Sequence, residues 1–262
     1  MKNLLIEKTV YPNAKLNLYL EIIGRREDGY HLLETIMTPI PLSDEMEIKL
    51  YKKGDIEVET LGLNLKKEDN LVYKVLKSIK ETFNIDFGIE IKLKKNIPSQ
   101  AGLGGGSSDA AFIIKFINEI FHFTDLDGLL KFSVKFGADI PFFIINKPSF
   151  CQGIGEIITP IEIPKMEFSL YTPKYSISTV KIFQNRDKFI RKENLFGKSL
   201  IKTDKDIQNI WNILEKEDKK YFNRLEDTLR KMEPELFNPK NGFSNDYHLT
   251  GSGSTFYKVV TL

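Results

Sequence analysis

The amino-acid sequence predicts a mixed α/β (α+β) fold arranged in two lobes. Two kinds of apolar spacing alternate along the first half of the chain: a period of two, typical of half-buried strands, and a spacing of three and four, typical of amphipathic helices. A third observation is a change of composition at 157–164, a run that contains two prolines. We therefore expect an N-terminal lobe over 1–156 and a C-terminal lobe over 157–262.

The first elements predicted along the chain are strands. Over 16–22 every second residue is apolar, so Lys15, Asn17 and Tyr19 share the opposite face of this strand. The turn pair of Asp28 and Gly29 ends the segment. Two further alternating runs, 46–50 and 56–58, flank a turn at 53–54 and together predict a β-hairpin.

Helices and a further strand follow. Asn70 precedes a three-and-four apolar pattern over 71–79, which predicts a helix with a polar cap. A strand over 89–93 leads into a glycine-rich segment, and a helix with one apolar stripe extends from there to Phe121. Another helix is predicted over 126–136, followed by a turn at GADIPFF, and a polar helical stretch is predicted over 204–232.

Composition favours a small-molecule partner over nucleic acid or a membrane. The chain has 262 residues, and its 38 basic residues nearly balance 36 acidic ones. One cysteine, Cys151, cannot form an internal disulfide, and the three histidines show no zinc-binding spacing. The first ten residues lack the apolar core of a signal peptide, so a cytoplasmic location is expected.

The glycine-rich loop (98–108) is the strongest local signal. Four glycines and two serines fall within the seven residues GLGGGSS, at the start of a predicted helix. Glycines let backbone N–H groups converge, and the helix adds its first-turn donors and positive dipole end, so a phosphate chain fits there. Ser107 stands where a Walker A loop needs lysine, and GxGxxG is absent. A simple strand-to-helix turn, the other interpretation, needs only one or two glycines.

Three motifs together resemble the GHMP kinase superfamily. They are NAKLNLYLEIIGRREDGYH, the loop segment IPSQAGLGGGSSDAA, and the late turn LTGSGSTFY, and the segments GADIPFF and GIGE also match. The motifs extend from Asn13 to Tyr257, so the resemblance covers nearly the whole chain. The opening motif is similar to the branch that acts on a cytidine diphosphate-linked methylerythritol, and not to the sugar or mevalonate kinases.

The resemblance implies both a fold and an activity. The implied fold is the two-lobed GHMP kinase fold, with an N-terminal ribosomal protein S5 domain 2-like lobe, a C-terminal ferredoxin-like lobe and the active site in the cleft between them. The implied activity is ATP-dependent phosphorylation of the C2 hydroxyl of cytidine diphosphate-linked methylerythritol, in non-mevalonate isoprenoid precursor synthesis. We expect a monomer or weak homodimer.

The resemblance also implies catalytic roles for two residues. Asp139, in GADIPFF, matches the aspartate that accepts the proton of the substrate hydroxyl as its oxygen attacks the γ-phosphorus. Lys15 matches the lysine whose charge keeps that aspartate ionised and compensates the transferring phosphoryl group. Without the resemblance, Asp139 would be interpreted as a turn or cap residue and Lys15 as a solvated strand residue.

Further residues are implied for the two ligands. Asn17 would bind the polyol, and cytosine would lie between Tyr30 and Phe183 with His31 at its polar edge. Thr179 and Gly251 complete the implied substrate site. ATP implies Mg²⁺, held chiefly by phosphate oxygens and water because the sequence shows no carboxylate cage. The implied ATP-binding residues are Pro98, Ser99, Gln100, Ala101, Gly102, Leu103, Gly104, Gly105, Gly106, Ser107, Ser108, Asn70, Leu71 and Lys95.

The sequence departs from the family pattern at two places. Gln100 and Ala101 stand where relatives often carry Gly or Ala, which the loop tolerates if both residues keep φ below zero. The chain also ends at Leu262, where the resemblance leads us to expect a further helix. Two other functions stay open: a related kinase for another alcohol such as mevalonate or homoserine, and a nucleotide-binding sensor without catalysis.

Overall fold

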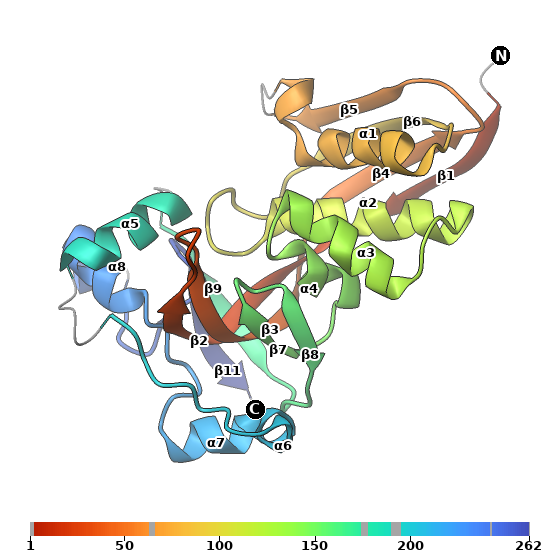
Figure 1. Ribbon diagram of the computed structural model, residues 1–262. Helices are drawn as coiled ribbons and strands as arrows, with labels where there is room; N and C mark the ends of the chain where they lie inside the picture. Colours follow the sequence, from red (N-terminus) through yellow and green to blue (C-terminus); the bar gives the residue numbers. More distant parts are fainter. Residues whose placement is uncertain (1–2, 63–65, 174–177, 190–194, 242, 262) are drawn as a thin grey trace. The chain divides into compact units, whose positions relative to one another are not determined.

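The computed structural model describes residues 3–62, 66–173, 178–189, 195–241 and 243–261 (Figure 1). The chain forms two compact units, and each combines segments that are separate in the sequence. Unit 1 comprises Met1–Ala14, Ile40–Pro98 and Gly104–Ile144, and unit 2 comprises Lys15–Pro39, Ser99–Leu103 and Ile145–Leu262. Both units mix helices and strands, as the sequence predicted. The predicted boundary between 156 and 157 separates lobes that are contiguous in sequence, and it stays a prediction.

Unit 1 contains a four-stranded sheet in the order β1-β4-β6-β5 (Figure 1). Its strands are β1 (Leu4–Val10), β4 (Glu45–Tyr51), β6 (Gly88–Lys94) and β5 (Ile56–Leu61). β4 pairs antiparallel with both β1 and β6, whereas β5 runs parallel to β6. The apolar residues of the alternating patterns point to one face, where Met46, Ile48 and Leu50 of β4 are fully buried.

The predicted hairpin of 46–50 with 56–58 is wrong, because β6 lies between β4 and β5. The connection of 52–55 therefore crosses the end of β6 instead of forming a tight hairpin turn. Gly88, the first residue of β6, makes this crossing possible. A Cβ at Gly88 would lie 2.8 Å from the Lys53 carbonyl oxygen and 3.0 Å from the Gly54 Cα atom.

Two helices cover the apolar face of this sheet: α1 (Leu71–Phe83) and α2 (Gly105–Phe121) (Figure 1). Both follow the predicted pattern, with buried stripes that include Val75 and Ile79 in α1 and Ile113 and Ile117 in α2. The predicted helix over 126–136 is α3 (Leu126–Ser133) continued by a 3₁₀ turn (Val134–Phe136). The segment GADIPFF, predicted as a turn, forms a turn at 138–139, and its last four residues begin α4 (Ile140–Ile145), in which Ile140 to Ile144 are buried.

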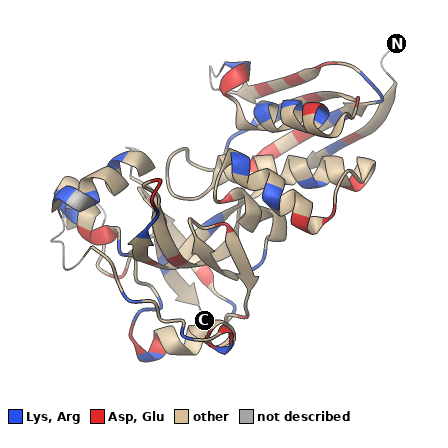
Figure 2. Ribbon diagram, viewed as in Figure 1, with Lys and Arg blue, Asp and Glu red and all other residues tan. Residues whose placement is uncertain are grey.

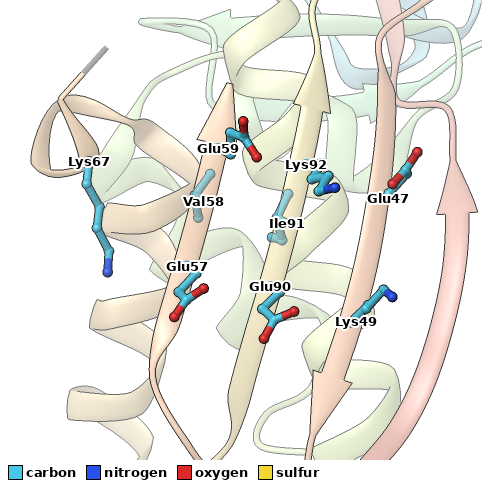
Figure 3. Close-up of a pocket in the computed structure, with 9 residues that line it drawn as sticks. All are labelled: Glu47, Lys49, Glu57, Val58, Glu59, Lys67, Glu90, Ile91 and Lys92. Atoms are coloured by element: carbon cyan, nitrogen blue, oxygen red, sulfur yellow. The ribbon is translucent and has the colours of Figure 1, made fainter. Parts of the chain in front are cut away.

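The opposite face of the unit 1 sheet carries cross-strand rows of charged residues that include both signs. Glu47, Lys92 and Glu59 form one cross-strand row. In Figure 3, Glu57, Glu90 and Lys49 form the next row, beside Lys67 from the 3₁₀ turn Lys67–Asp69. Opposite charges on neighbouring strands attract one another weakly in water. Figure 2 shows the same interleaving of both signs along the helices.

Unit 2 contains two further sheets. One has the order β2-β3-β7-β8 and the other β10-β11-β9. The strands are β2 (Asn13–Arg25), β3 (His31–Ser43), β7 (Ser149–Gly153), β8 (Ile157–Pro160), β9 (Glu167–Tyr171), β10 (His248–Leu249) and β11 (Phe256–Thr261). The first two residues of β2 and the last four of β3 belong to unit 1. β2 contains the strand predicted over 16–22.

The described part of unit 2 contains four α-helices, and two of them, α5 and α8, contribute to one apolar cluster. The four helices are α5 (Thr179–Phe189), α6 (Asp204–Gln208), α7 (Ile210–Lys216) and α8 (Glu226–Met232), with 3₁₀ turns at Pro234–Phe237 and Pro239–Asn241. The cluster joins Leu20 and Ile22 of β2 to residues of α5, α8, β10, β11 and the segments that flank α8: Ile182, Leu225, Leu229, Leu236, Phe243, Leu249 and Phe256. Burial of these side chains is the main favourable term for this part of the fold.

The continuous helical stretch predicted over 204–232 is wrong, because non-helical residues separate α7 from α8. In that interval the backbone pairs with the edge of β2. Leu20 donates an N–H bond to the Phe222 carbonyl at 2.8 Å, and Arg224 donates to the Leu20 carbonyl at 2.8 Å. These bonds satisfy an otherwise open strand edge. Within the described ranges, none of the helices has both the length and the apolar character needed to cross a bilayer.

The crossing over β6 generates a stability prediction. Replacing Gly88 by Ala forces the Lys53 carbonyl and the Gly54 backbone away from the strand, so we expect unfolding free energy to fall by about 1 to 3 kcal/mol. The measurement is chemical denaturation of the purified chain. Lys92→Ala, at an exposed position of the same strand, is the control and should change stability by no more than about 0.5 kcal/mol. Equal stability of the Gly88→Ala variant and the parent would contradict the crossing.

Candidate functional site

Lys15 and Asn17 form a buried polar pair on β2, in unit 2. Their side chains are 3% and 5% exposed, which is far from the solvated position expected of an ordinary strand lysine. The Lys15 Nζ atom lies 2.5 Å from Asn17 Oδ1. Asn17 Nδ2 donates to Thr35 Oγ1 at 2.8 Å, and the Asn17 backbone N–H donates to Thr250 Oγ1 at 2.8 Å. Asn17 is thereby fixed in one orientation that presents its oxygen to the lysine.

The 250–255 turn contacts this pair through Gly251. A Cβ at Gly251 would lie 3.2 Å from Asn17 Oδ1 and 3.3 Å from Lys15 Nζ, and its φ of 55° favours glycine. Asn223 Nδ2 holds the turn by donating to the Gly251 carbonyl at 2.8 Å. The structure therefore brings together three residues that the sequence assigned to the substrate and catalytic site: Lys15, Asn17 and Gly251.

The first half of the glycine-rich loop, Ser99–Leu103, belongs to unit 2 and is tied to the same elements. The Lys15 N–H donates to the Leu103 carbonyl at 3.0 Å, and the Thr255 N–H donates to the Ala101 carbonyl at 3.2 Å. Gly102 lies between them with φ of 77°, and a Cβ there would come within 2.4 Å of the Thr250 carbonyl oxygen. The loop backbone thus lies directly against the 250–255 turn.

Gln100 departs from the expectation that it keeps φ below zero. Its φ is 53°, in the left-handed region, whereas Ala101 is not among the residues with positive φ. Gln100 is exposed and its side chain can point away from the backbone, so the strain that a side chain meets in this region stays moderate. Pro98 and Ser99 beside it are also exposed.

The second half of the loop opens α2, in unit 1. Gly104 is the N-cap residue with φ of 74°, and the Ser108 N–H closes the first helical turn on the Gly104 carbonyl at 2.9 Å. In an α-helix the N–H groups ahead of this bond lack intrahelical acceptors and point outward with the positive end of the dipole. Gly106 is exposed, and an added Cβ there would have no atom within 4 Å. Backbone donors at this helix start are therefore accessible to an anion.

The segment that contains Asp139 lies beside the start of α2. A Cβ at Gly137 would be 3.9 Å from Ser107 Oγ, so the GADIPFF segment lies beside the first turn of α2. The Asp139 carbonyl accepts the Phe143 N–H of α4 at 3.5 Å, which places Asp139 at the start of that short helix. Asp139 is partly exposed. It belongs to unit 1, whereas Lys15 belongs to unit 2.

Asn70 and Lys95, both assigned to ATP on the sequence, have clear structural contacts in unit 1. Asn70 caps α1, because its Oδ1 accepts the Val72 N–H at 2.9 Å, and its Nδ2 donates to Thr60 Oγ1 at 3.0 Å. Leu71 begins the helix. The Lys95 ammonium is ion-paired with Asp44, and its Nζ lies 2.6 Å from Asp109 Oδ2. The cap predicted for Asn70 is confirmed, and nucleotide contacts of all three residues stay predictions.

Two of the residues assigned to the substrate's nucleobase stack on each other in the structure. Phe183 of α5 stacks on His31 at the start of β3, with ring centroids 5.0 Å apart and an angle of 28° between planes. Tyr30 is 60% exposed. Thr179 Oγ1, at the start of α5, lies 2.6 Å from Ser252 Oγ in the 250–255 turn. His31 and Phe183 are therefore neighbours, and an arrangement of cytosine between Tyr30 and Phe183 stays a prediction.

Several supporting residues were missed by the sequence interpretation. Thr35 and Thr250 orient Asn17, and Asp44 and Asp109 surround Lys95. A signal existed for Asp109, which is an acid on the apolar stripe of a helix that also contains Ala110 and Ile113. No pattern marks Thr35 or Asp44. Among the described residues, no group of three or more His, Cys, Asp or Glu side chains is arranged to hold a metal ion.

Comparison with known proteins identifies the relatives of this chain. Residues 70–147 match the model of the GHMP kinases N-terminal domain. The matched residues of this chain include α1, the glycine-rich loop and Asp139. A 4-diphosphocytidyl-2-C-methyl-D-erythritol kinase of Francisella tularensis subsp. holarctica is 33% identical over 95% of this chain and 86% of that protein.

Two further matches agree with this relationship. The enzyme of the same name from Clostridium tetani is 44% identical over 67% of this chain, and in that match the chain spans 63% of the relative's length. A crystal structure of 4-(cytidine 5'-diphospho)-2C-methyl-D-erythritol kinase superposes with a TM-score of 0.76 at 29% identity, over 97% of this chain and 90% of that one. The fold is therefore the GHMP kinase fold, and the chain belongs to the 4-diphosphocytidyl-2-C-methyl-D-erythritol kinase family of the GHMP kinases.

Proposed function

We propose that this protein uses ATP to phosphorylate the C2 hydroxyl of 4-diphosphocytidyl-2-C-methyl-D-erythritol, in non-mevalonate isoprenoid precursor synthesis. The observation that carries the proposal is its relationship, over 95% of the chain, to enzymes named for this substrate. The buried arrangement of Lys15, Asn17 and Gly251 supports it, because a charged side chain is rarely buried without a functional or structural partner. Solved structures of a homoserine kinase and a mevalonate kinase are similar at only 15% and 19% identity, so they support the fold alone.

The proposed chemistry needs few side chains. The C2 hydroxyl transfers its proton to the Asp139 carboxylate while its oxygen attacks the γ-phosphorus of ATP, and the bond from that phosphorus to the bridging oxygen of ADP breaks. Lys15 supplies positive charge for the transferring phosphoryl group, and Asn17 binds the polyol. Because phosphoryl transfer depends mainly on positioning and charge compensation, this set is chemically sufficient.

The glycine-rich loop is proposed to bind the phosphates of ATP. Its support is the start of α2, where Gly104 is the N-cap, Gly106 is exposed and the backbone N–H groups of the first turn lack intrahelical acceptors. We expect Mg²⁺ to be held chiefly by phosphate oxygens and water, and it would compensate the negative charge of the triphosphate. Asn70, Leu71 and Lys95 would lie around the nucleotide.

The nucleobase of the substrate is proposed to bind at Tyr30, His31 and Phe183. The stacked pair of His31 and Phe183 supplies an aromatic face next to a polar ring, a combination that suits cytosine. A nucleoside diphosphate derivative is charged and water-soluble, which supports a cytoplasmic location. Balanced surface charge supports a small-molecule partner over nucleic acid. We propose that the protein acts as a monomer or weak homodimer.

The substrate prediction is tested with a panel of alcohols. We expect turnover with ATP, Mg²⁺ and 4-diphosphocytidyl-2-C-methyl-D-erythritol, and little with mevalonate or homoserine, which lack a nucleobase for Phe183 and His31. The measurement is ADP release together with detection of the phosphorylated product. Faster turnover of mevalonate or homoserine than of 4-diphosphocytidyl-2-C-methyl-D-erythritol would contradict the proposed substrate. ATP binding without turnover of any alcohol would indicate a nucleotide-binding sensor.

The role of Asp139 is tested by Asp139→Asn, which keeps the size of the side chain and removes its basicity. We expect kcat to fall by at least about a hundredfold. Affinity for a non-hydrolysable ATP analogue should stay within about threefold of the parent, because the loop donors are unchanged. Asp127→Asn, at an exposed position of α3, is the control and should keep full activity. A kcat near that of the parent would rule out Asp139 as the base.

The role of Gly102 is tested by Gly102→Ala. The added methyl group would lie 2.4 Å from the Thr250 carbonyl oxygen, so the loop must move away from the 250–255 turn. We expect a loss of about 1 to 3 kcal/mol in unfolding free energy and a higher KM for ATP. Gly106→Ala is the matched control for stability, and it should leave the melting temperature unchanged or raise it, since Ala favours a helix. A Gly102→Ala variant with unchanged stability would contradict the close packing.

A further inference from the structure

Three charged side chains of unit 1 meet between the segment that precedes the glycine-rich loop and the helix α2 that follows it. The Lys95 ammonium lies between two carboxylates, with an ion pair to Asp44 and a separation of 2.6 Å from Asp109 Oδ2. The Asp44 and Asp109 side chains are 0% and 2% exposed, and that of Lys95 is 15% exposed. We call these three residues the Lys95 cluster.

Asp44 also fixes the backbone that enters the loop. Its Oδ1 accepts the Asn96 N–H at 2.6 Å and the Ile97 N–H at 2.8 Å, immediately before Pro98. A Cβ at Gly105, the first residue of α2, would lie 3.3 Å from Asp44 Oδ2. One buried carboxylate therefore holds the chain before the loop and contacts the helix start that follows it.

Asp109 connects the cluster to the other end of the loop. It lies in α2 just after the loop residue Ser108, so its bond to Lys95 joins the helix to the segment that precedes the loop. Its second oxygen, Oδ1, is buried and has no hydrogen-bond partner among the described residues. Burial raises the pKa of Asp109 to about 7, while Lys95 opposes this shift. Two carboxylates share a single ammonium here, so each depends strongly on that cation.

We propose that Asp44 and Asp109 are positioning residues, which hold the Lys95 ammonium and through it fix the two ends of the glycine-rich loop in the conformation that binds ATP. The inference rests on the proposed ATP-dependent activity and assigns to Lys95 a role different from direct phosphate contact. The ammonium already has two carboxylates as partners, and both bonds anchor segments of the loop. Its contribution to ATP binding is the geometry of the loop backbone.

A double-variant cycle separates positioning from direct contact. The affinity of the full chain for a non-hydrolysable ATP analogue is measured for the parent, Lys95→Met, Asp109→Asn and Lys95→Met/Asp109→Asn, and melting temperatures are recorded. We expect Lys95→Met to weaken binding about tenfold or more, because two buried carboxylates lose their cation. In the double variant, Asp109→Asn removes one of those two charges. The double variant should therefore bind the analogue at least about threefold more tightly than Lys95→Met does. A lysine that contacted the phosphates directly would allow no recovery.

A second variant and a control complete the experiment. Asp109→Ala removes the connection to α2 without leaving excess negative charge, and it should weaken the analogue several-fold even if Lys95→Met does not fold. At saturating ATP and substrate, kcat of Asp109→Ala should stay within about threefold of the parent, because a positioning role acts on binding through the loop and not on the transferring phosphoryl group. Lys94→Met, at an exposed neighbouring position, should bind as the parent does.

The outcomes distinguish this inference from the proposed function. Unchanged affinity in Lys95→Met or in Asp109→Ala, or a double variant as weak as Lys95→Met, would overturn the positioning role. A parent protein that binds the analogue but phosphorylates no methylerythritol derivative would overturn the proposed function and leave the binding cycle interpretable. A parent that binds no ATP analogue would overturn both.

Discussion

The backbone contact between the glycine-rich loop and the 250–255 turn is the constraint on which the unit 2 part of the site depends. Gly102 approaches the Thr250 carbonyl so closely that a side chain cannot be accommodated. The N–H groups of Lys15 and Thr255 hold the loop on either side of Gly102. The same turn presents Gly251 to Lys15 and Asn17. One close approach of three backbone segments therefore sets the positions of the loop, the lysine and the amide together.

The lysines of the two sites, Lys15 and Lys95, have partners of different charge. On β2, Lys15 meets the neutral oxygen of Asn17, and Thr35 and Thr250 complete the hydrogen bonds of that amide. In the Lys95 cluster, the ammonium is shared by two carboxylates that are themselves buried. A buried ion costs desolvation free energy that only well-placed partners offset. The first arrangement pairs the cation with a neutral amide, whereas the second uses the cation to join segments of the chain.

The local patterns predicted most elements because local forces decide them. The apolar stripes of α1 and α2, the Asn70 cap and the alternation in β2, β4 and β6 each follow from residues a few positions apart. The wrong predictions have tertiary causes. β6 takes the place beside β4 that the hairpin would have given to β5, and Gly88 permits the crossing. Residues between α7 and α8 leave the helix because their backbone pairs with Leu20. The second half of GADIPFF begins α4, in which Ile140 to Ile144 are buried, and only 138–139 form the turn that was predicted for the whole segment.

The sequence by itself determined the glycine-rich loop from residue type and spacing, and its ordered motifs carried the resemblance that implied the family and the candidates Lys15, Asn17 and Asp139. Only the tertiary structure decided which side chains surround them. Thr35, Thr250 and Asp44 are remote in sequence from the groups that they hold, and no local pattern encodes such a partnership. The same holds for the stacking of His31 on Phe183. Hydrogen bonds and ion pairs between distant segments exist only after the chain has buried its apolar surface, and that burial brings them within reach.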